Sequence, residues 1–498
     1  MSPDLVHHLQ VLDPLHRDFV GFDTHYRLAD GRITRRHYLD SAASTLALGC
    51  ARRVVDELLR HYANTHSDLH FSARIVNHAY DWAHGQVLRF VRADPGRYSA
   101  FFAGSGCTAP LNRLARVLAA RRPERDVVLV SLMEHHANDL PHRKHAGQVI
   151  RIPLVGEAPT LGAVDLAALE DLLEQYRGRV NYVAISAASN VTGIINPVHD
   201  LAALAHAHDA WVMVDASQYL AHAPLAISDT GAMERELDAL VFSGHKLYAP
   251  GSPGVAVARR ALFEDSDPDE VGGGMVDDVF LNSYQITTRF PDREEAGTPN
   301  LLGAVQLGAV LNVLQRIGME RIHAAEQQRL RGLLAELVAL PGVRVYGDSD
   351  PDRTPRVGTV AFNLDGLEHG LVAAVLNDYF NVAVRNGCFC AHPYVRELLK
   401  PELWALDLDP DDAAAIQRRQ GMVRASLGLY TVDEDLEALL AGLRDLLARP
   451  DYYRTLYQAD AEGNFDHRTF RAPASTLFDP EARLEQALAR LGVTDDVL

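Results

Sequence analysis

Short apolar runs alternate with helix-like segments between about Ser99 and Arg260. Such runs are typical of buried strands, whereas apolar residues at helical spacing, as in Asp165–Tyr176 and Val198–His208, indicate amphipathic helices. Strand–helix–strand repetition predicts a mostly parallel sheet with helices on both faces, and ligands of such sheets bind at the carboxyl ends of the strands. The predicted strands are Val127–Val130, Val149–Pro153, Tyr182–Ser186, Trp211–Asp215, Ala239–Ser243 and Gly254–Ala258.

A second region follows the Gly/Pro-punctuated stretch Gly297–Asn300. Helical patterns there surround two short strand candidates, which predicts a smaller α/β domain. The helical patterns are Leu302–Ile317, Met319–Leu340, Glu368–Phe380 and Asp433–Ala448, and the strand candidates are Thr359–Asn363 and Gly421–Ser426. We expect an N-terminal segment 1–34 packing on the small domain, a large domain 35–300, the small domain 301–450, and an extension 451–498 with one short helix at Leu484–Leu491.

The composition narrows the class of protein. A chain of 498 residues that is 47% hydrophobic can bury a substantial core, and its formal charge of −18 argues against a nucleic-acid partner. No apolar stretch approaches the roughly 18 residues that span a bilayer, and the N-terminus lacks the pattern of a secretory signal. Four cysteines are too few for a disulfide framework, which favours a reducing compartment. We therefore expect a cytoplasmic protein without a membrane contact.

The stretch Ser243–Lys246, at the end of the apolar run Asp238–Phe242, carries the strongest chemical signal. It places a lysine beside a hydroxyl, an imidazole and a turn, where desolvation can remove the proton of the amine near neutral pH. A neutral lysine amine can form a Schiff base with a carbonyl cofactor. A lysine beside a turn is more often a surface residue, so the interpretation of Lys246 as reactive depends on the other groups at the same sheet edge.

Several groups upstream of Lys246 follow compatible strand ends. Gly104–Thr108 is a glycine-rich turn that opens a helix, and free amides at such a turn stabilise a phosphate group. Asp215 ends its strand, where a carboxylate can pair with a protonated pyridine nitrogen, and His135 or His136 can stack on a flat ring. Taken singly, each is more often a capping or packing residue, so the prediction rests on the constellation. The amides that could donate to a phenolic oxygen of the ring are Asn190 and Gln218.

Cys388 and Cys390 lie in a turn-rich segment just after Arg385. A partly exposed thiol near Arg385 and His392 is expected to have a lowered pKa and to act as a thiolate nucleophile, whereas inert packing cysteines are the other interpretation. The C-x-C-x-H sequence supplies at most three of the four ligands of a zinc site, so we expect no metal. On a predicted strand of the small domain, Arg424 can hold a substrate carboxylate through two hydrogen bonds; a surface salt bridge is the ordinary alternative.

A series of motifs stands in the order of a known family: YLDSAAS, GCTAPLN, MEHHAN, SNVTGIINPV, VDASQ, FSGHKLYAP, EAGTPN and RASLGLY. On these motifs the chain from about Tyr38 to Leu447 resembles the class V aminotransferase group, in particular the group II cysteine desulfurases and selenocysteine lyases. The resemblance implies a fold type I pyridoxal-phosphate-dependent transferase, with a large domain around a mostly parallel seven-stranded-type sheet and a smaller α/β domain. It also implies bound pyridoxal 5'-phosphate and a homodimer with shared active sites.

The resemblance assigns roles to individual residues. Lys246 would bind the cofactor covalently, Asp215 would contact the pyridine nitrogen and His135 would stack on the ring. Cys390 would accept sulfur as a persulfide, and Arg424 would bind the substrate carboxylate. The other cofactor contacts would come from Cys107, Thr108, Asn190, Gln218, Ser243 and His245, with Thr298 reaching the phosphate of the partner subunit, and the other substrate contacts from Ala42 and Asn190.

The cysteine loop departs from the usual pattern. Desulfurases usually read R-x-G-H-H-C where Arg385–Cys390 reads RNGCFC, which looks more like the loop of molybdenum-cofactor sulfurases. Ser41 and Cys107 replace an asparagine and a threonine of the family pattern, and the residues after about Asp451 lie outside the resemblance. Two roles stay open for Cys388, relay of the persulfide and a regulatory disulfide with Cys390.

The expected reaction is removal of sulfur from L-cysteine or a related amino acid, giving alanine and a persulfide on Cys390 for a protein sulfur acceptor. One alternative is a class V aminotransferase, epimerase or C–S lyase that acts on another amino acid. The other is a cofactor-binding regulatory or scaffold subunit without turnover. Alanine release from L-cysteine, with and without the thiol of Cys390, separates these alternatives.

Overall fold

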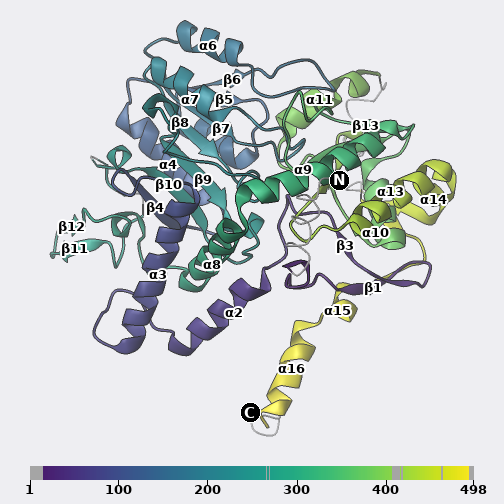
Figure 1. Ribbon diagram of the computed structural model, residues 1–498, viewed down its shortest axis with the longest axis horizontal. Helices are drawn as coiled ribbons and strands as arrows, with labels where there is room; N and C mark the ends of the chain where they lie inside the picture. The colour runs from purple at the N-terminus through teal and green to yellow at the C-terminus, as the bar shows by residue number, and fades with distance from the viewer. Residues whose placement is uncertain are drawn as a thin grey trace.

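The computed structural model describes residues 15–264, 266–268, 270–405, 416, 419–460 and 464–492. Two units lie side by side, one built on a large sheet and the other on a smaller sheet (Figure 1). The contact expected for the N-terminal segment 1–34 can be followed only from residue 15 onward, because residues 1–14 lie outside the described range.

Seven strands form the large sheet within the described chain, in the order β4-β10-β9-β8-β7-β5-β6. The strands β5 to β9 run parallel, and β10 is antiparallel to both β4 and β9. This confirms the α/β class, and every strand predicted for the sheet is present to within two residues. The strand β4 was not predicted as a strand. The bounds are β4 Tyr98–Ala103, β5 Val127–Ser131, β6 Gln148–Ile152, β7 Val180–Ser186, β8 Trp211–Asp215, β9 Ala239–Ser243 and β10 Gly254–Arg259.

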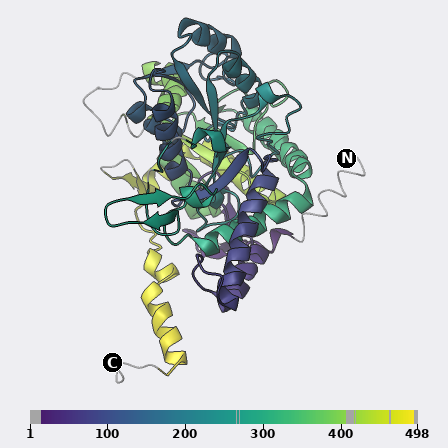
Figure 2. The same ribbon diagram turned by 90° about the vertical axis from the view of Figure 1, so that its left-hand side faces the viewer.

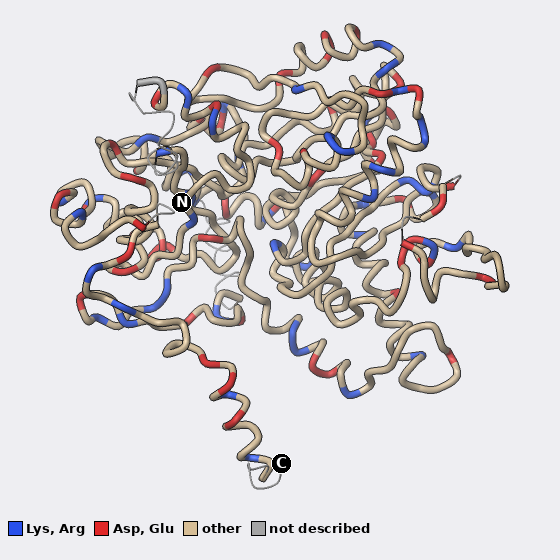
Figure 3. Tube along the Cα trace, turned by 180° about the vertical axis from the view of Figure 1, so that it is seen from behind, with Lys and Arg blue, Asp and Glu red and all other residues tan. Residues whose placement is uncertain are grey.

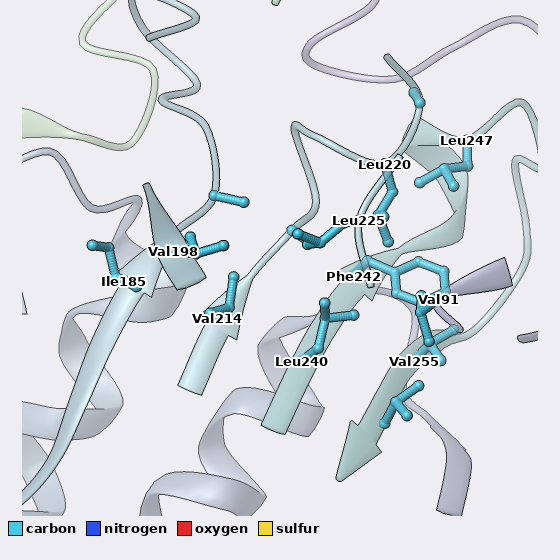
Figure 4. Close-up of a cluster of buried hydrophobic side chains, with 14 of the residues drawn as sticks. Val91, Ile185, Val198, Val214, Leu220, Leu225, Leu240, Phe242, Leu247 and Val255 are labelled. Carbon is cyan, nitrogen blue, oxygen red and sulfur yellow. The ribbon is translucent and has the colours of Figure 1, made fainter. Parts of the chain in front are cut away.

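Both faces of this sheet are buried. In β5, Val127 and Leu129 belong to one buried cluster, and Val128 and Val130 belong to another, because successive side chains of a strand point to opposite faces. Figure 4 shows part of the first cluster, where side chains of neighbouring strands meet. The second face is covered by α4 (Thr108–Arg121), and the first by α6 (Leu166–Gln175), α7 (Val198–Ala207) and α8 (Leu301–Ile317).

The helix α8 packs closely on α3 (Phe71–Phe90). A Cβ atom on Gly308 would lie 2.9 Å from the ring of Trp82, so this crossing needs a residue without a side chain. The remaining elements of this unit are α2 (Gly49–Leu58), α5 (Leu140–His145) and a projecting hairpin of β11 (Val276–Val279) and β12 (Tyr284–Ile286) (Figure 1). Within the described residues no single helix is long and apolar enough to cross a membrane; α8 and α9 (Met319–Ala339) pass that test only as a pair bent by 78°.

The smaller sheet has the order β13-β14-β17-β16 and is antiparallel throughout. Its apolar face packs against three helices, whose leucine side chains form a separate core with Val360, Phe362 and Val423. The element bounds are α9 Met319–Ala339, β13 Val343–Val345, β14 Thr359–Leu364, α10 His369–Phe380, β16 Arg385–Gly387, α11 His392–Ala405, β17 Met422–Ser426 and α13 Asp433–Ala448. The strands and helices that the sequence predicted for this region are all present.

The described N-terminal residues contact both units. Phe19 packs edge-on against Tyr248 of the large unit, whereas Ala29 donates a main-chain hydrogen bond to Asp378 of α10. The strands β1 (His25–Arg27) and β2 (Ile33–Arg35) form a hairpin, and β3 (His37–Tyr38) pairs in parallel with β15 (Val382–Ala383).

The C-terminal extension begins with α14 (Pro450–Leu456) and a hairpin of β18 (Tyr457–Ala459) and β19 (Phe465–His467), which the sequence did not predict. His467 Nε2 lies 2.9 Å from the Tyr379 hydroxyl, which anchors the hairpin on α10. After α15 (Ala474–Leu477), α16 (Pro480–Arg490) extends away from the body of the molecule and has no buried residue (Figures 1 and 2). Acidic and basic positions alternate along α16 (Figure 3).

Candidate active site

The carboxyl ends of four parallel strands bring the predicted site residues to one edge of the large sheet. His135 follows β5, Asn190 follows β7, Asp215 ends β8 and Lys246 follows β9. Asp215 lies directly between Ser186 of β7 and Val241 of β9. Burial lowers the pKa values of His135 and His245, and the charge of Lys246 adds to both shifts, which places the amine close to both imidazoles.

Lys246 has a fixed backbone and a free amine. It ends a short 3-10 turn at Gly244–Lys246, where the carbonyl oxygen of His245 accepts a hydrogen bond of 3.0 Å from the Thr45 N–H. Lys246 is half-buried, and its amine makes no hydrogen bond or ion pair with any residue in the described part of the chain. Such an amine is free to bond to a carbonyl carbon.

A cavity of about 660 Å³ lies at the N-terminus of α4, lined by Gly104, Gly106, Thr108 and His245. Gly104 has a φ of +56°, and a Cβ atom there would lie 2.7 Å from that of Ala109. A Cβ atom on Gly106 would reach 3.3 Å from Ser243 Oγ and so enter the same space. The missing side chains and the helix N-terminus leave room and N–H groups for a phosphate, which fits the phosphate of pyridoxal 5'-phosphate.

The groups around the cofactor ring position also fit. Burial, with the Lys246 charge adding to it, lowers the pKa of His135 to about 3, so its imidazole is neutral and suited to stacking on an aromatic ring. The carboxylate of Asp215 is 5% exposed and lies 4.0 Å from Cys107 Sγ. Burial raises the pKa of the Cys107 thiol to about 11, and the Asp215 charge acts in the same direction. Cys107 therefore stays neutral, and the Asp215 carboxylate beside it can face a pyridine nitrogen.

The other predicted cofactor contacts lie on different sides of this edge. The Cys107 N–H donates to Ser243 Oγ at 2.8 Å, which joins the helix N-terminus to the end of β9. Gln218 Nε2 donates to the Ala42 carbonyl oxygen at 2.7 Å, and the Ala42 N–H in turn donates to Ser426 Oγ of the small sheet at 2.8 Å. Thr298 is exposed in the loop before α8, where its side chain makes no hydrogen bond with described residues.

Arg424, on β17, is 3% exposed and points its guanidinium at the large unit. It donates to the Asn190 carbonyl oxygen at 2.8 Å and to Asp40 Oδ1 at 3.3 Å. Its Nε atom is buried and has no hydrogen-bond partner among the described residues. Burial lowers the pKa of Arg424 to about 10 and Asp40 opposes that shift, so the guanidinium stays charged and keeps a donor available for a substrate carboxylate.

The cysteine loop contacts this edge from the small unit. Asn190 Nδ2 donates to the Phe389 carbonyl oxygen at 2.6 Å, and the His136 N–H donates to the Cys390 carbonyl oxygen at 2.7 Å. The Arg424 guanidinium lies 4.7 Å from the centre of the Phe389 ring. Cys390 is exposed, and these contacts hold its loop against the sheet edge at Asn190 and His136.

Two contacts of the loop side chains were not predicted. The Arg385 guanidinium lies 4.0 Å from Asp40 Oδ2. The rings of His392 and His136 are stacked 4.9 Å apart, and Nδ1 of His392 lies 3.1 Å from Nε2 of His136.

Sequence reasoning missed Glu134, a fully buried carboxyl directly before His135. It accepts hydrogen bonds from the Ser186 N–H at 2.9 Å and from Asn138 Nδ2 at 2.6 Å, and it contacts the Ser131 hydroxyl. Burial raises its pKa to about 7. Glu134 thereby ties the end of β5 to the end of β7. Its place inside the MEHHAN motif was the available signal.

Comparison with known proteins agrees with this geometry. The family model described as Aminotransferase class-V matches residues 37–439. A cysteine desulfurase of Salmonella gallinarum is 32% identical over 411 residues, which cover 82% of this chain and 92% of that protein. Solved structures are similar as well. A cysteine desulfurase from Thermococcus onnurineus NA1 has a TM-score of 0.70 at 29% identity, covering 82% of this chain and 94% of the other. The cysteine desulfurase CsdA from Escherichia coli has a TM-score of 0.68 at 26% identity, covering 88% and 98%.

Proposed function

The chain belongs to the aminotransferase class-V family, and on that premise we propose that it is a pyridoxal-phosphate-dependent cysteine desulfurase. The enzyme removes sulfur from L-cysteine and yields alanine and a persulfide on Cys390. The observation that carries this proposal is the exposed Cys390 in a loop whose main chain is held by Asn190 and His136 at the sheet edge that carries Lys246. The likeness to cysteine desulfurases over most of the chain supports it.

The cofactor would be held by groups that the fold already fixes. The glycine-rich turn and the helix N-terminus at Thr108 receive the phosphate, with Cys107, Ser243 and His245 around it. Bound pyridoxal phosphate supplies an electron sink for the electron pair on the substrate Cα. Lys246 Nζ would hold the cofactor and, when free, would take the proton from the substrate Cα. His135 and Asp215 would hold the ring, and Asn190 and Gln218 would contact its phenolic oxygen.

Substrate orientation and sulfur transfer fall to residues of the small unit. Arg424 binds the substrate carboxylate, with Ala42 and Asn190 at its sides. The thiolate of Cys390 bonds to the substrate sulfur while the Cβ–S bond breaks, and the electron pair of that bond stays with the carbon. After protonation the three-carbon amino acid leaves as alanine, and the sulfur stays on Cys390 until an acceptor protein takes it.

The assembly that we propose is a homodimer with shared sites. Exposed apolar side chains gather on the β11–β12 hairpin and on the neighbouring segment before α3, including Leu281 at 96% exposed and Leu69 at 91% exposed. His66 of that segment lies beside the loop that carries Thr298, because its Nε2 donates to the Gly297 carbonyl oxygen at 3.2 Å. A second copy would cover this surface and bring a cofactor phosphate to Thr298. The four cysteines are all free, which is consistent with a reducing cytoplasm.

The experiment that tests the proposal measures alanine release from L-cysteine by the holoenzyme and by its Cys390→Ala variant. We expect alanine from the wild-type enzyme and a loss of at least about a hundredfold in the variant, which is the low end of what a positioned reactive group contributes. Unchanged turnover in the variant would favour the lyase or aminotransferase alternatives. A panel of amino acids then identifies the substrate.

A further inference from the structure

Cys388 and Cys390 occupy two corners of one tight turn. The Ala391 N–H donates to the Cys388 carbonyl oxygen at 2.9 Å, which closes a four-residue turn. The two central residues, Phe389 and Cys390, have φ values of +52° and +55°. Positive φ at both central positions defines a type I′ turn, in which Gly and Asn are the favoured residues.

The residues Phe389 and Cys390 are unusual in that conformation, because left-handed backbone is costly for residues with large side chains. The contacts of Phe389 with Asn190 and Arg424, and of Cys390 with His136, hold the turn in place. Backbone strain of this kind persists where surrounding contacts over-determine it, and it gathers at functional sites.

The turn brings the two cysteines within reach of each other. Residues on either side of a left-handed residue have Cα atoms about 5.4 Å apart, by the geometry of an α-helix turn. A disulfide needs Cα atoms about 4.4–6.8 Å apart. The Cys390 charge also raises the pKa of Cys388, which agrees with this proximity.

The two thiols differ in their surroundings. Cys390 is exposed, whereas Cys388 is half-buried and its Sγ donates to the Gln420 carbonyl oxygen at 3.2 Å. Burial raises the pKa of the Cys388 thiol, and only the charge of Arg396 acts against this. Cys388 is therefore held as a thiol at neutral pH, whereas Cys390 is exposed.

We propose that Cys388 is a resolving residue that attacks the persulfide on Cys390, releases hydrosulfide and leaves a Cys388–Cys390 disulfide. This inference rests on the proposed desulfurase function. Cys388 Sγ bonds to Cys390 Sγ, and the bond from Cys390 Sγ to the outer sulfur breaks. The outer sulfur is reduced and leaves as hydrosulfide, the Cys388 proton goes to solvent, and both cysteines become oxidised. An external dithiol then reduces the disulfide, becomes oxidised itself and returns the loop to its active state.

This step gives the persulfide sulfur a second route off the enzyme, besides transfer to an acceptor protein. An acceptor protein that arrives quickly takes the persulfide from Cys390, because the protonated Cys388 attacks slowly. Without an acceptor, the persulfide is discharged as hydrosulfide and the enzyme stops with its nucleophile blocked. The turn thus makes turnover depend on the supply of acceptor or reductant.

The test uses reduced holoenzyme, freed of small thiols and kept without oxygen, with a limiting amount of L-cysteine. Hydrosulfide and alanine are measured over time, and the alkylated tryptic peptide Asn386–Arg396, which carries both cysteines, is weighed without reduction. We expect hydrosulfide to approach the amount of alanine, while the peptide becomes two hydrogens lighter and resists alkylation. The Cys388→Ser variant should lose the hydrosulfide release and keep its persulfide on Cys390. The Cys50→Ser variant is the matched control, because Cys50 is also half-buried with a pKa raised by burial.

The possible results distinguish failure of the resolving role of Cys388 from failure of the proposed desulfurase function. Alanine formation with a lasting persulfide on Cys390 of the wild type would overturn the resolving role and leave the proposed function intact. A persulfide found on Cys388 would overturn it as well, in favour of a relay. Absence of alanine would overturn the proposed function and this inference together. If Cys388→Ser fails to fold, equilibration of the wild type in dithiothreitol redox buffers decides the same point, since a loop that forms no disulfide at any ratio contradicts the proposal.

Discussion

The main-chain N–H of His136 donates to the carbonyl oxygen of Cys390 at 2.7 Å. His136 follows β5 of the large sheet, and Cys390 belongs to a loop of the small unit. The same strand end carries His135, so one short segment carries the imidazole that we propose to stack on the ring and fixes the main chain of the cysteine that we propose as the nucleophile. This link explains how a loop with costly backbone conformations is kept at the mouth of the site.

Replacing Lys246 by alanine should abolish covalent cofactor binding. The chain has three lysines, and Lys246 is the one that follows a strand of the large sheet at the predicted site. The wild-type protein should show visible absorbance with pyridoxal phosphate, and borohydride reduction should fix the cofactor on the Lys246 peptide. Lys144→Ala, an exposed lysine on α5, serves as the control and should keep the absorbance. An adduct on Lys144 or Lys400 would contradict the assignment.

Replacing Arg424 by glutamine should weaken substrate binding more than it slows the later steps. A hydrogen bond to a charged group contributes about 1.5–3 kcal/mol, so we expect KM for L-cysteine to rise about 10- to 100-fold. Arg344→Gln is the control, because Arg344 lies in the same small sheet and forms only partly exposed ion pairs. Steady-state kinetics separates KM from kcat. A fall in kcat at unchanged KM would assign Arg424 a role other than carboxylate binding.

Replacing Glu134 by glutamine should change how stability depends on pH. Burial raises the folded pKa of Glu134 to about 7, above its ordinary value of 4.5. The folded protein therefore binds the proton of the Glu134 carboxyl more tightly than the unfolded chain does. The stabilisation from this proton is fully present below pH 4.5 and is lost as pH rises through 7. The change in unfolding free energy between pH 5 and pH 7 should differ by about 2–3 kcal/mol between wild type and variant. Denaturant unfolding at the two pH values measures this, and equal differences in both proteins would disprove it.

Deletion of residues 479–498 should leave the thermal midpoint of unfolding unchanged. No side chain of α16 is buried, and exposed positions contribute within about 0.5 kcal/mol. Tyr457→Ala gives the contrast, because Tyr457 is 3% exposed and its hydroxyl donates to Asp378 Oδ2 at 2.8 Å. Loss of a buried aromatic side chain costs about 3–5 kcal/mol. Calorimetry of both variants checks this, and a destabilised deletion variant would show that α16 has a folded partner.

The large sheet could be predicted because its strands are continuous apolar runs buried on both faces, such as Val180–Ser186. The strand β4 was missed because its pairing with β10 joins segments far apart in the chain. The three-residue strands β13, β16, β18 and β19 are too short to show a pattern of alternation. The domain boundaries at residues 34, 300 and 450 stay predictions, and the described N-terminal residues contact both units rather than the small one alone.

The candidate site residues could be predicted from their motifs, but the contacts between their side chains and other segments could not. The contact of Asn190 with the Phe389 carbonyl oxygen depends on a loop with two positive φ values. Residues other than Gly and Asn rarely adopt positive φ, so the residue types in this loop do not predict its conformation. Asp40, which pairs with Arg424, was present in the YLDSAAS motif and was overlooked because a lone carboxylate carries no signal of its partner.

The central claim is that sulfur moves from L-cysteine to Cys390. The most direct test gives the holoenzyme L-cysteine labelled with heavy sulfur, stops the reaction early with an alkylating reagent, and locates the label by mass spectrometry. We expect heavy sulfur attached to Cys390 together with an equal amount of alanine. Alanine without labelled sulfur on Cys390, or label first found on Cys50 or Cys107, would contradict it.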